Sequence, residues 1–403
     1  MKRYVIIGAS GRGYMMFARK LFESHKEDAK IVAICDPNPV RSEYYRKETY
    51  SDVKIYTDFE LMLNNEKPDG VIVATVDCYH HEYIIKALDM GYDVYTEKPM
   101  TTTEENCLAI REAEKRSGKR VAVTFNCRFM PYYAKIKEII ASGVIGGPLA
   151  INYIYSLNTR HGGEYYMRWH RMMKNSGGML IHKSTHHFDI ANWLFDDEPV
   201  SVTAQATRQY YGLDDRPHGE RCSTCKYTEN CRSYVDYGKD EMTQALYFGE
   251  AEKVDGYVRD HCVFKTDTDI YDTMSVSVAY EKGGILTYSL NMYDAREGYT
   301  LNVLGELGSI EASTYFEGEN YRLVIRYTDG RVEEVLFPKS EGTHSGGDDR
   351  LIDMLFGKGG EDKLGLCSDS FDGVKSVMIG VAANKSIKEG VRVDLRPSLE
   401  RMK

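Results

Sequence analysis

The sequence predicts an α/β protein of two domains, the first with a parallel, doubly wound sheet and the second an α+β domain with a large open sheet, mixed or antiparallel. Its length of 403 residues exceeds what one core usually serves. Short apolar runs alternate with helical patterns in the first third of the chain, whereas strand patterns dominate after the glycine-rich break at 143–148. We place the domains at 1–125 and 126–403.

The first strand and the first helix enclose a glycine-rich turn. A β-branched run at 4–7 leads into GASGRG, and a helical pattern follows at 14–22. Glycines in such a turn let the backbone approach a pyrophosphate, whose charge then lies against the free N–H groups of the helix. A lone glycine fingerprint is weak, and here a serine stands where the strict pattern has its second glycine. The candidate cofactor residues of this turn are Gly8, Ser10, Gly11, Arg12 and Gly13.

The second strand, 30–35, ends at an acidic residue, Asp36. An acidic side chain at this distance from the glycine turn receives the ribose hydroxyls of a dinucleotide and disfavours a 2′-phosphate. Arg41 follows in the sequence, and its positive charge could offset the repulsion between Asp36 and a 2′-phosphate. We therefore expect NAD as the cofactor, with NADP possible.

Strand and helix signals then repeat through the first domain. Helical patterns cover 42–49, 59–64, 80–90, 103–117 and 132–142, and strand runs cover 54–56, 70–75 and 93–95. Ligands of a doubly wound sheet bind at the carboxyl ends of its strands. The candidate cofactor residues there are Thr75, His80, Glu97 and Lys98.

Lys98 stands at a strand end beside Pro99, which resists continued helix or ladder structure. There its ammonium can bind a hydroxyl or carbonyl oxygen of a substrate, and desolvation would lower its pKa toward a working range. A surface lysine in a loop is the alternative, but functional sites in open α/β sheets concentrate at these positions.

The most polar stretch of the second half is SGGMLIHKSTHHFDIANWL, at 176–194, which we expect to form a single helix. His182 and His186 lie one turn apart and Asp189 follows by three. A carboxylate could orient an imidazole there as a general base requires, or the two imidazoles could bind a zinc or iron ion. Packed histidines without a chemical role are a third interpretation.

Strands predominate from residue 149 onward. Their alternation of apolar and polar residues predicts a sheet with one buried face and one face open to solvent or to a partner. The runs lie at 149–157, 200–207, 274–280, 285–291, 300–304, 309–313, 321–327 and 332–337.

Several segments together resemble the Gfo/Idh/MocA oxidoreductases, the glucose-fructose oxidoreductase and inositol dehydrogenase family. They are GASGRG, DVYTEKPM, FNCRFMP, SGGMLIHKSTHHFDIANWL and DGVKSVMIGVAANKSIKEG. The resemblance implies an N-terminal Rossmann domain, a C-terminal domain built on a large mixed sheet, and a nicotinamide held between them. It also implies a homodimer or homotetramer formed through the outer face of that sheet.

The family usually places an aspartate before its histidine in the second-half helix. Aligned on that pattern, the histidine is His186, our candidate general base, and His182 replaces the aspartate. The resemblance implies Lys98, His186 and His182 as catalytic residues, with Lys183 and Asp189 shaping the site. The candidate substrate residues are Lys98, Arg128, Arg168, Trp169, Lys183 and His186. Residues 343–348 could also bring His344 and Asp348 toward the cleft, although a glycine turn explains them nearly as well.

A cysteine-rich insertion interrupts the strand run at about 208–263. Three cysteines form C-x2-C-x5-C, a spacing that lets them meet one ion, and a fourth could complete a tetrahedral set. We favour structural zinc slightly over free thiols as the interpretation of these cysteines. An iron–sulfur cluster and disulfides are less favoured. The candidate ligands are Cys222, Cys225, Cys231 and Cys262.

Composition limits the partners. The net charge of −9 argues against nucleic acid as a general partner. The chain shows no export signal and no apolar stretch of membrane-spanning length, so we expect a cytoplasmic protein.

From the motifs and the resemblance we expect an NAD(P)-dependent dehydrogenase or reductase acting on a hydroxyl of a sugar, polyol or glycoside. The alternatives are a glycosidase or lyase that keeps NAD bound and oxidises the sugar transiently, and a sugar or nucleotide sensor without catalysis.

Overall fold

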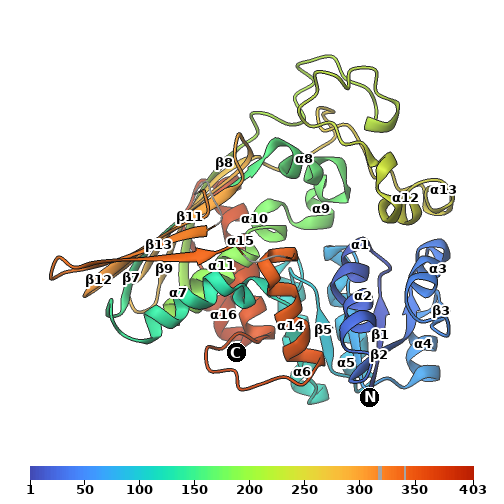
Figure 1. Ribbon diagram of the computed structural model, residues 1–403, viewed down its shortest axis with the longest axis horizontal. Helices are drawn as coiled ribbons and strands as arrows, with labels where there is room; N and C mark the ends of the chain where they lie inside the picture. The colour runs from blue at the N-terminus through green and yellow to red at the C-terminus, as the bar shows by residue number, and fades with distance from the viewer. Residues whose placement is uncertain (316–319, 340–341) are drawn as a thin grey trace.

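The computed structural model describes residues 1–315, 320–339 and 342–403. Figure 1 shows two sheets with their helices side by side, the first formed mainly by strands of the first domain and the second by strands that follow residue 147. Within the described ranges, no helix is both long enough and apolar enough to cross a membrane.

The first sheet has the order β15-β6-β5-β4-β1-β2-β3 in the described chain. Its strands from the N-terminal half are parallel to one another, as the alternation of strands and helices predicts. The strands are β1 Lys2–Ile7, β2 Ala29–Cys35, β3 Lys54–Tyr56, β4 Gly70–Val73, β5 Val94–Thr96, β6 Val121–Val123 and β15 Ser368–Asp369.

Helices on both faces of this sheet bury its apolar residues. The first of them continues from α1 through a π-helical segment, Tyr14–Ala18, into α2. The helices are α1 Gly11–Gly13, α2 Arg19–Ser24, α3 Pro39–Glu48, α4 Phe59–Glu66, α5 His80–Asp89 and α6 Glu104–Ser117. Helix α7, Pro131–Ala141, lies against the second sheet instead, where the Tyr132 hydroxyl donates to the carbonyl of Arg322 at 2.6 Å.

The second sheet has the order β14-β13-β12-β11-β7-β10-β9-β8-β16 in the described chain. It is mixed, because β7 and β10 are parallel while the other described pairs are antiparallel. The strands are β7 Pro148–Asn158, β8 Pro199–Thr207, β9 Thr273–Tyr280, β10 Ile285–Asp294, β11 Gly298–Gly305, β12 Gly308–Ser313, β13 Asn320–Tyr327, β14 Val332–Pro338 and β16 Val393–Asp394. Buried and exposed residues alternate along β9, β10 and β11, which confirms a sheet with one covered face.

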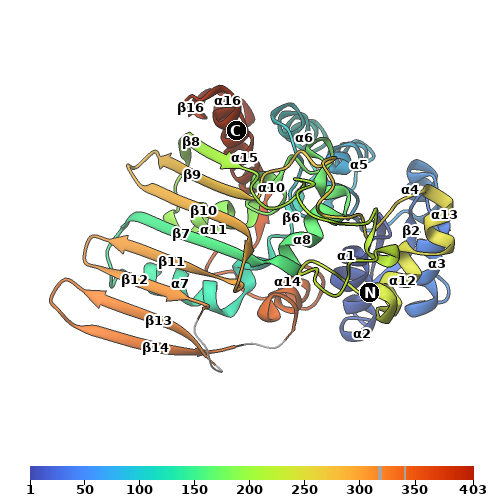
Figure 2. The ribbon, with the colours of Figure 1, turned by 90° about the horizontal axis from the view of Figure 1, so that it is seen from above.

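Helices of the second half cover the inner face of this sheet and fill the space between the two sheets (Figure 2). The long helix α15 packs against β8 and α11. These helices are α8 Thr159–Met167, α9 Met173–Ser176, α10 Met179–His182, α11 Thr185–Phe195, α15 Ser370–Glu389 and α16 Arg396–Met402. Three other helices of the second half lie against the first domain: α12 Glu241–Tyr247 and α13 Glu250–Asp255 contact α3, and α14 Gly347–Phe356 contacts α2.

The chain returns to the first sheet near its C-terminus. Strand β15 adds to β6 in the antiparallel sense. Phe356, the last residue of α14, contacts the rings of Tyr4, Phe17 and Tyr95. The two halves of the molecule are therefore joined by side chains that lie far apart in the sequence.

The prediction of one helix over 176–194 is wrong. The N–H groups of Lys183 and Ser184 both donate to the carbonyl of Met179, which breaks the regular hydrogen-bond register between α10 and α11. At this break the Ser184 hydroxyl forms a hydrogen bond with the hydroxyl of Tyr288, 3.0 Å away. His182 therefore belongs to a different helix from His186 and Asp189.

Candidate active site

The glycine turn after β1 has the geometry that a dinucleotide site requires. Gly8 has a φ of +96°, and a Cβ there would lie 2.6 Å from the carbonyl oxygen of Ala74. The Ser10 hydroxyl donates to that same carbonyl at 3.1 Å and accepts from the Gly13 N–H at 3.0 Å. Ser10 thus caps the helix that begins at the turn, a role that its side chain can fill and a glycine cannot.

Asp36 lies at the end of β2, beside this turn, and only 7% of its surface is exposed. Its carboxylate accepts from the N–H groups of Ala9 and Asn38, both at 2.7 Å. Burial raises the pKa of Asp36, and these two N–H groups oppose the rise. Asp36 therefore holds the turn and the start of α3 together at the edge where a ribose would bind.

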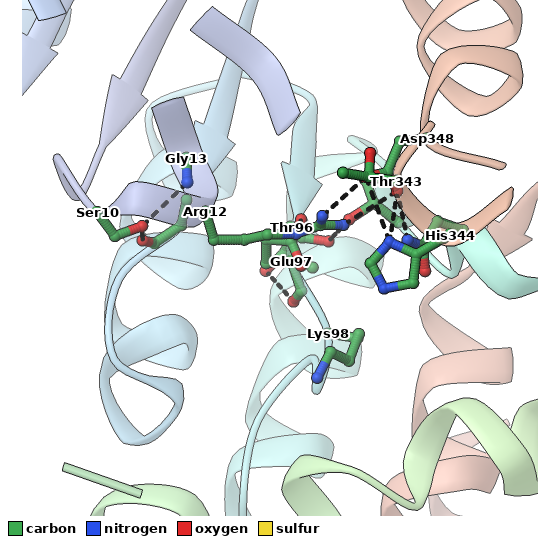
Figure 3. Close-up of polar contacts among 12 residues, drawn as sticks. Ser10, Arg12, Gly13, Thr96, Glu97, Lys98, Thr343, His344 and Asp348 are labelled. Carbon is green, nitrogen blue, oxygen red and sulfur yellow. Dashed lines mark hydrogen bonds and ion pairs between the residues drawn. The ribbon is translucent and has the colours of Figure 1, made fainter. Parts of the chain in front are cut away.

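Arg12 does not extend over the turn. Figure 3 shows its side chain reaching away from Ser10 toward Glu97 and Asp348. Its guanidinium is 3.1 Å from Glu97 Oε1 and 3.0 Å from Asp348 Oδ2. Asp348 also accepts from Thr343 and lies 3.2 Å from Nδ1 of His344. The ion pair of Arg12 with Asp348 thus links the two domains, and Glu97 pairs with the same guanidinium from the first domain.

Lys98 follows Glu97 at the end of β5, and its peptide bond to Pro99 is cis. Its ammonium donates to the carbonyl of His182 at 2.8 Å, so the end of the first sheet meets α10 directly. Burial lowers the pKa of Lys98 to about 8, although the charge of Asp77 acts in the opposite direction.

Asp77 is a site residue that the sequence analysis missed. It follows β4, is 3% exposed, and its Oδ2 lies 2.5 Å from Nδ1 of His182. Burial raises the pKa of Asp77 and lowers the pKa of His182. His182 stands where the family pattern has an aspartate. Asp77, after a strand of the first domain, therefore brings a carboxyl group to the same place. Its position at the carboxyl end of a parallel strand was the signal that could have identified it.

His186 lies in the first turns of α11, every residue of which is buried. Its Nδ1 has no hydrogen-bond partner within the part of the chain that the structure describes. Burial lowers the pKa of His186 well below its usual value, and the charge of Lys98 lowers it further. The imidazole of His344 is close, at 6.3 Å between ring centres. His186 is therefore a neutral imidazole at neutral pH.

Asp189 does not orient either histidine. Both of its oxygens accept from the guanidinium of Arg128, at 2.8 and 2.6 Å, and Arg128 also pairs with Asp372 at 3.3 Å. Arg128 and Asp189 are almost fully buried, so this bidentate pair ties η3 (Asn126–Phe129) to α11. The structure therefore engages the guanidinium of Arg128, a candidate substrate residue, in buried ion pairs with Asp189 and Asp372.

The other candidate substrate residues lie around His182. The Lys183 ammonium is 5.2 Å from the centre of the Tyr155 ring, and Tyr155 and Tyr165 raise its pKa against the opposing effect of burial. Trp169 stacks on His170, and both rings contact His182. Arg168 pairs with Glu164 at 2.5 Å. These residues form an aromatic wall with one buried cation, Lys183.

His80 and Thr75 support the strand ends. The His80 ring lies between the carbonyl oxygens of Pro99 and Thr75, at 2.8 and 3.1 Å. Burial lowers its pKa to about 4, so the neutral ring donates to one of these carbonyls. His80 therefore holds the loops after β4 and β5 together and positions Lys98.

The four cysteines of the insertion line one cavity, together with Phe264 and Met167. All four are free thiols, and burial raises the pKa of Cys222 to about 12. Among the described residues, no group of three or more histidine, cysteine, aspartate or glutamate side chains is placed to hold a metal ion. The structure thus gives no support to zinc at the cysteines, or to a metal between His182 and His186.

The fold and the site together define a two-domain, dinucleotide-dependent oxidoreductase. Comparison with known proteins gives the family. The model for the NAD-binding Rossmann fold of the Gfo/Idh/MocA oxidoreductase family matches residues 2–125, and the model for its C-terminal α/β domain matches residues 137–395. The chain belongs to the Gfo/Idh/MocA oxidoreductase family, which confirms the resemblance seen in its motifs.

Individual relatives agree with this assignment. The chain is 33% identical over 415 residues to YteT of Bacillus subtilis (strain 168), which carries an oxidoreductase name, covering 96% of each chain. It is 32% identical over 201 residues to a scyllo-inositol 2-dehydrogenase (NAD(+)) of the same strain, covering 50% of this chain and 56% of that protein. Among solved structures, the WlbA dehydrogenase from Bordetella pertussis, in complex with NADH and UDP-GlcNAcA, has a TM-score of 0.68 at 19% identity, covering 98% of both chains.

Proposed function

We propose that this protein is an NAD-dependent dehydrogenase that oxidises a hydroxyl-bearing carbon of a sugar, polyol or glycoside, and reduces the matching carbonyl in the reverse direction. The observation that carries the proposal is the hydrogen bond from Lys98, at the end of β5, to the carbonyl of His182 in α10. His186 of α11 is near enough for the charge of Lys98 to lower its pKa. The inositol dehydrogenase names among the relatives support a polyol or sugar substrate.

Lys98 and His186 divide the chemistry in this proposal. The Lys98 ammonium binds the substrate oxygen, and the neutral imidazole of His186 accepts the hydroxyl proton as that oxygen becomes a carbonyl. Asp77 fixes the ring of His182 beside them. Lys183 adds a second cation to the pocket, which favours substrates that carry a carboxylate.

The residues of the first domain fit a dinucleotide. A Cβ at Gly8 would collide with the carbonyl of Ala74, just after β4, so only glycine fits at this position. We expect the ribose hydroxyls to bind at Asp36. The Gly11 N–H is engaged by the Tyr247 hydroxyl at 2.6 Å, so a pyrophosphate oxygen would replace that hydroxyl. When bound, NAD supplies the hydride acceptor for the oxidation.

The direct test is the formation of reduced nicotinamide from NAD⁺ with a panel of inositols, aldoses, glycosides and uronic acids. We expect absorbance of the reduced cofactor to accumulate with at least one of these compounds. Turnover of a glycoside without any net reduction of NAD⁺ would contradict the proposal, and so would binding of NAD⁺ without turnover of any compound.

The outer face of the second sheet is the proposed oligomer interface. Thr203, Ser277, Thr287, Asn152 and Asn302 lie in register across neighbouring strands, and none of them is charged. Apolar side chains flank this row, including Ile154 and Ile285, which are 46% and 49% exposed. The part of the sheet face from β8 to β11 therefore presents an uncharged row with apolar neighbours, which fits a second copy of the chain.

We expect Thr287→Arg to dissociate the oligomer, because it places an unpaired charge at the centre of that face. Sedimentation velocity would compare its mass with that of the unaltered protein and of Asn64→Arg, a control on the exposed surface of α4. An unaltered protein that is monomeric, or a Thr287→Arg variant of unchanged mass, would contradict the interface.

A further inference from the structure

The cysteine-rich insertion, residues 208–263, reaches the dinucleotide turn. Its helices α12 and α13 lie beside α3 in both ribbon views (Figures 1 and 2). Tyr247, the last residue of α12, accepts a hydrogen bond from the Gly11 N–H at 2.6 Å. The insertion therefore forms one wall of the proposed cofactor site, although the sequence analysis gave it only a structural role.

The end of α13 lies at the ribose edge of this site. Asp255 Oδ2 is 2.7 Å from the guanidinium of Arg41 and 3.0 Å from Nδ2 of Asn38. Asn38 is fully buried and its backbone N–H binds Asp36. Asp36 and Asp255 are thus two carboxylates grouped around the first residues of α3.

Arg41 is the cation that a 2′-phosphate would use, and the insertion holds it. Besides the ion pair with Asp255, its Nε donates to the carbonyl of Leu246 at 2.8 Å, and its guanidinium lies 5.3 Å from the centre of the Tyr247 ring. An arginine that is paired with a carboxylate has less attraction left for a second anion.

We propose that Asp255 is a specificity-determining residue of the dinucleotide site, which neutralises Arg41 and adds a second negative charge, so that the site accepts a ribose 2′-hydroxyl and rejects a 2′-phosphate. This inference rests on the proposed function. It extends the NAD preference from Asp36, in the Rossmann domain, to a residue of the insertion.

The test compares the dissociation constants of NADP⁺ and NAD⁺ for the full-length protein by calorimetry. Asp255→Asn keeps the shape and the hydrogen bond to Asn38 but removes the charge. We expect the ratio of the NADP⁺ constant to the NAD⁺ constant to fall about tenfold, since Arg41 is freed and one repulsive charge is lost. Glu250→Gln is the matched control, because it removes an exposed charge from the same helix; its ratio should stay that of the unaltered protein.

A second variant tests the route through Arg41. We expect the double variant Asp255→Asn with Arg41→Ala to lose most of the gain for NADP⁺. An unchanged ratio in Asp255→Asn, an equal change in Glu250→Gln, or a gain that persists without Arg41 would overturn the inference while leaving NAD⁺ binding itself intact. Failure of the unaltered protein to bind either dinucleotide would instead remove the proposed function on which the inference rests.

Discussion

Replacing Lys98 with methionine should lower kcat by roughly 10²- to 10⁴-fold, the usual range for a group that acts on the transferring proton or its oxygen. The methionine keeps most of the side-chain volume but removes the ammonium that binds the substrate oxygen. Lys98→Arg should restore little of the lost kcat, because a planar guanidinium cannot replace a compact ammonium group in a confined site. Thermal unfolding of each variant would separate lost chemistry from lost folding, and a Lys98→Met enzyme of ordinary kcat would contradict the assignment.

The pH dependence of the unaltered enzyme follows from the same residue. Burial lowers the pKa of Lys98 to about 8, so its charge is present below that pH and is lost as the pH rises through it. If the charge binds the substrate oxygen, kcat should be level near neutral pH and should fall above about 8. Lys98→Arg should lose this fall, since arginine stays charged throughout the range.

Replacing His186 with glutamine should also lower kcat by roughly 10²- to 10⁴-fold, because an amide cannot accept the hydroxyl proton. The neighbouring His187 offers a matched control. Its Nδ1 lies 2.6 Å from the Tyr288 hydroxyl, a contact within the core of the second domain. His187→Gln should therefore reduce thermal stability but keep the pH profile of the unaltered enzyme. Similar kinetic losses in both variants would mean that His186 is structural.

Much of the architecture could be predicted because it depends on local patterns. The apolar run before the glycine turn and the acidic residue after β2 are short-range signals, and both appear in the structure where their spacing places them. The strands of the second sheet follow the alternation of apolar and polar residues in the same way.

The contacts that complete the site could not be predicted, because they join residues that are distant in the sequence. Asp77 is read as part of a strand-end loop until the fold brings it against His182. Asp189 is one helical turn from His186, yet the bidentate pairing with Arg128 satisfies both of its oxygens. Arg12 looks like a phosphate ligand within GASGRG, but α14 places Asp348 within its reach. Leaving a buried charge unpaired costs free energy, so each of these groups pairs with whichever opposite charge the fold brings near it, and that partner is not visible in the local sequence.

The most direct measurement for the whole account is a crystal structure of the protein with NAD⁺ bound. We predict that the nicotinamide ring lies in contact with both the Lys98 ammonium and the His186 imidazole, with the ribose of the adenosine half at Asp36. A nicotinamide ring placed away from either Lys98 or His186 would contradict it.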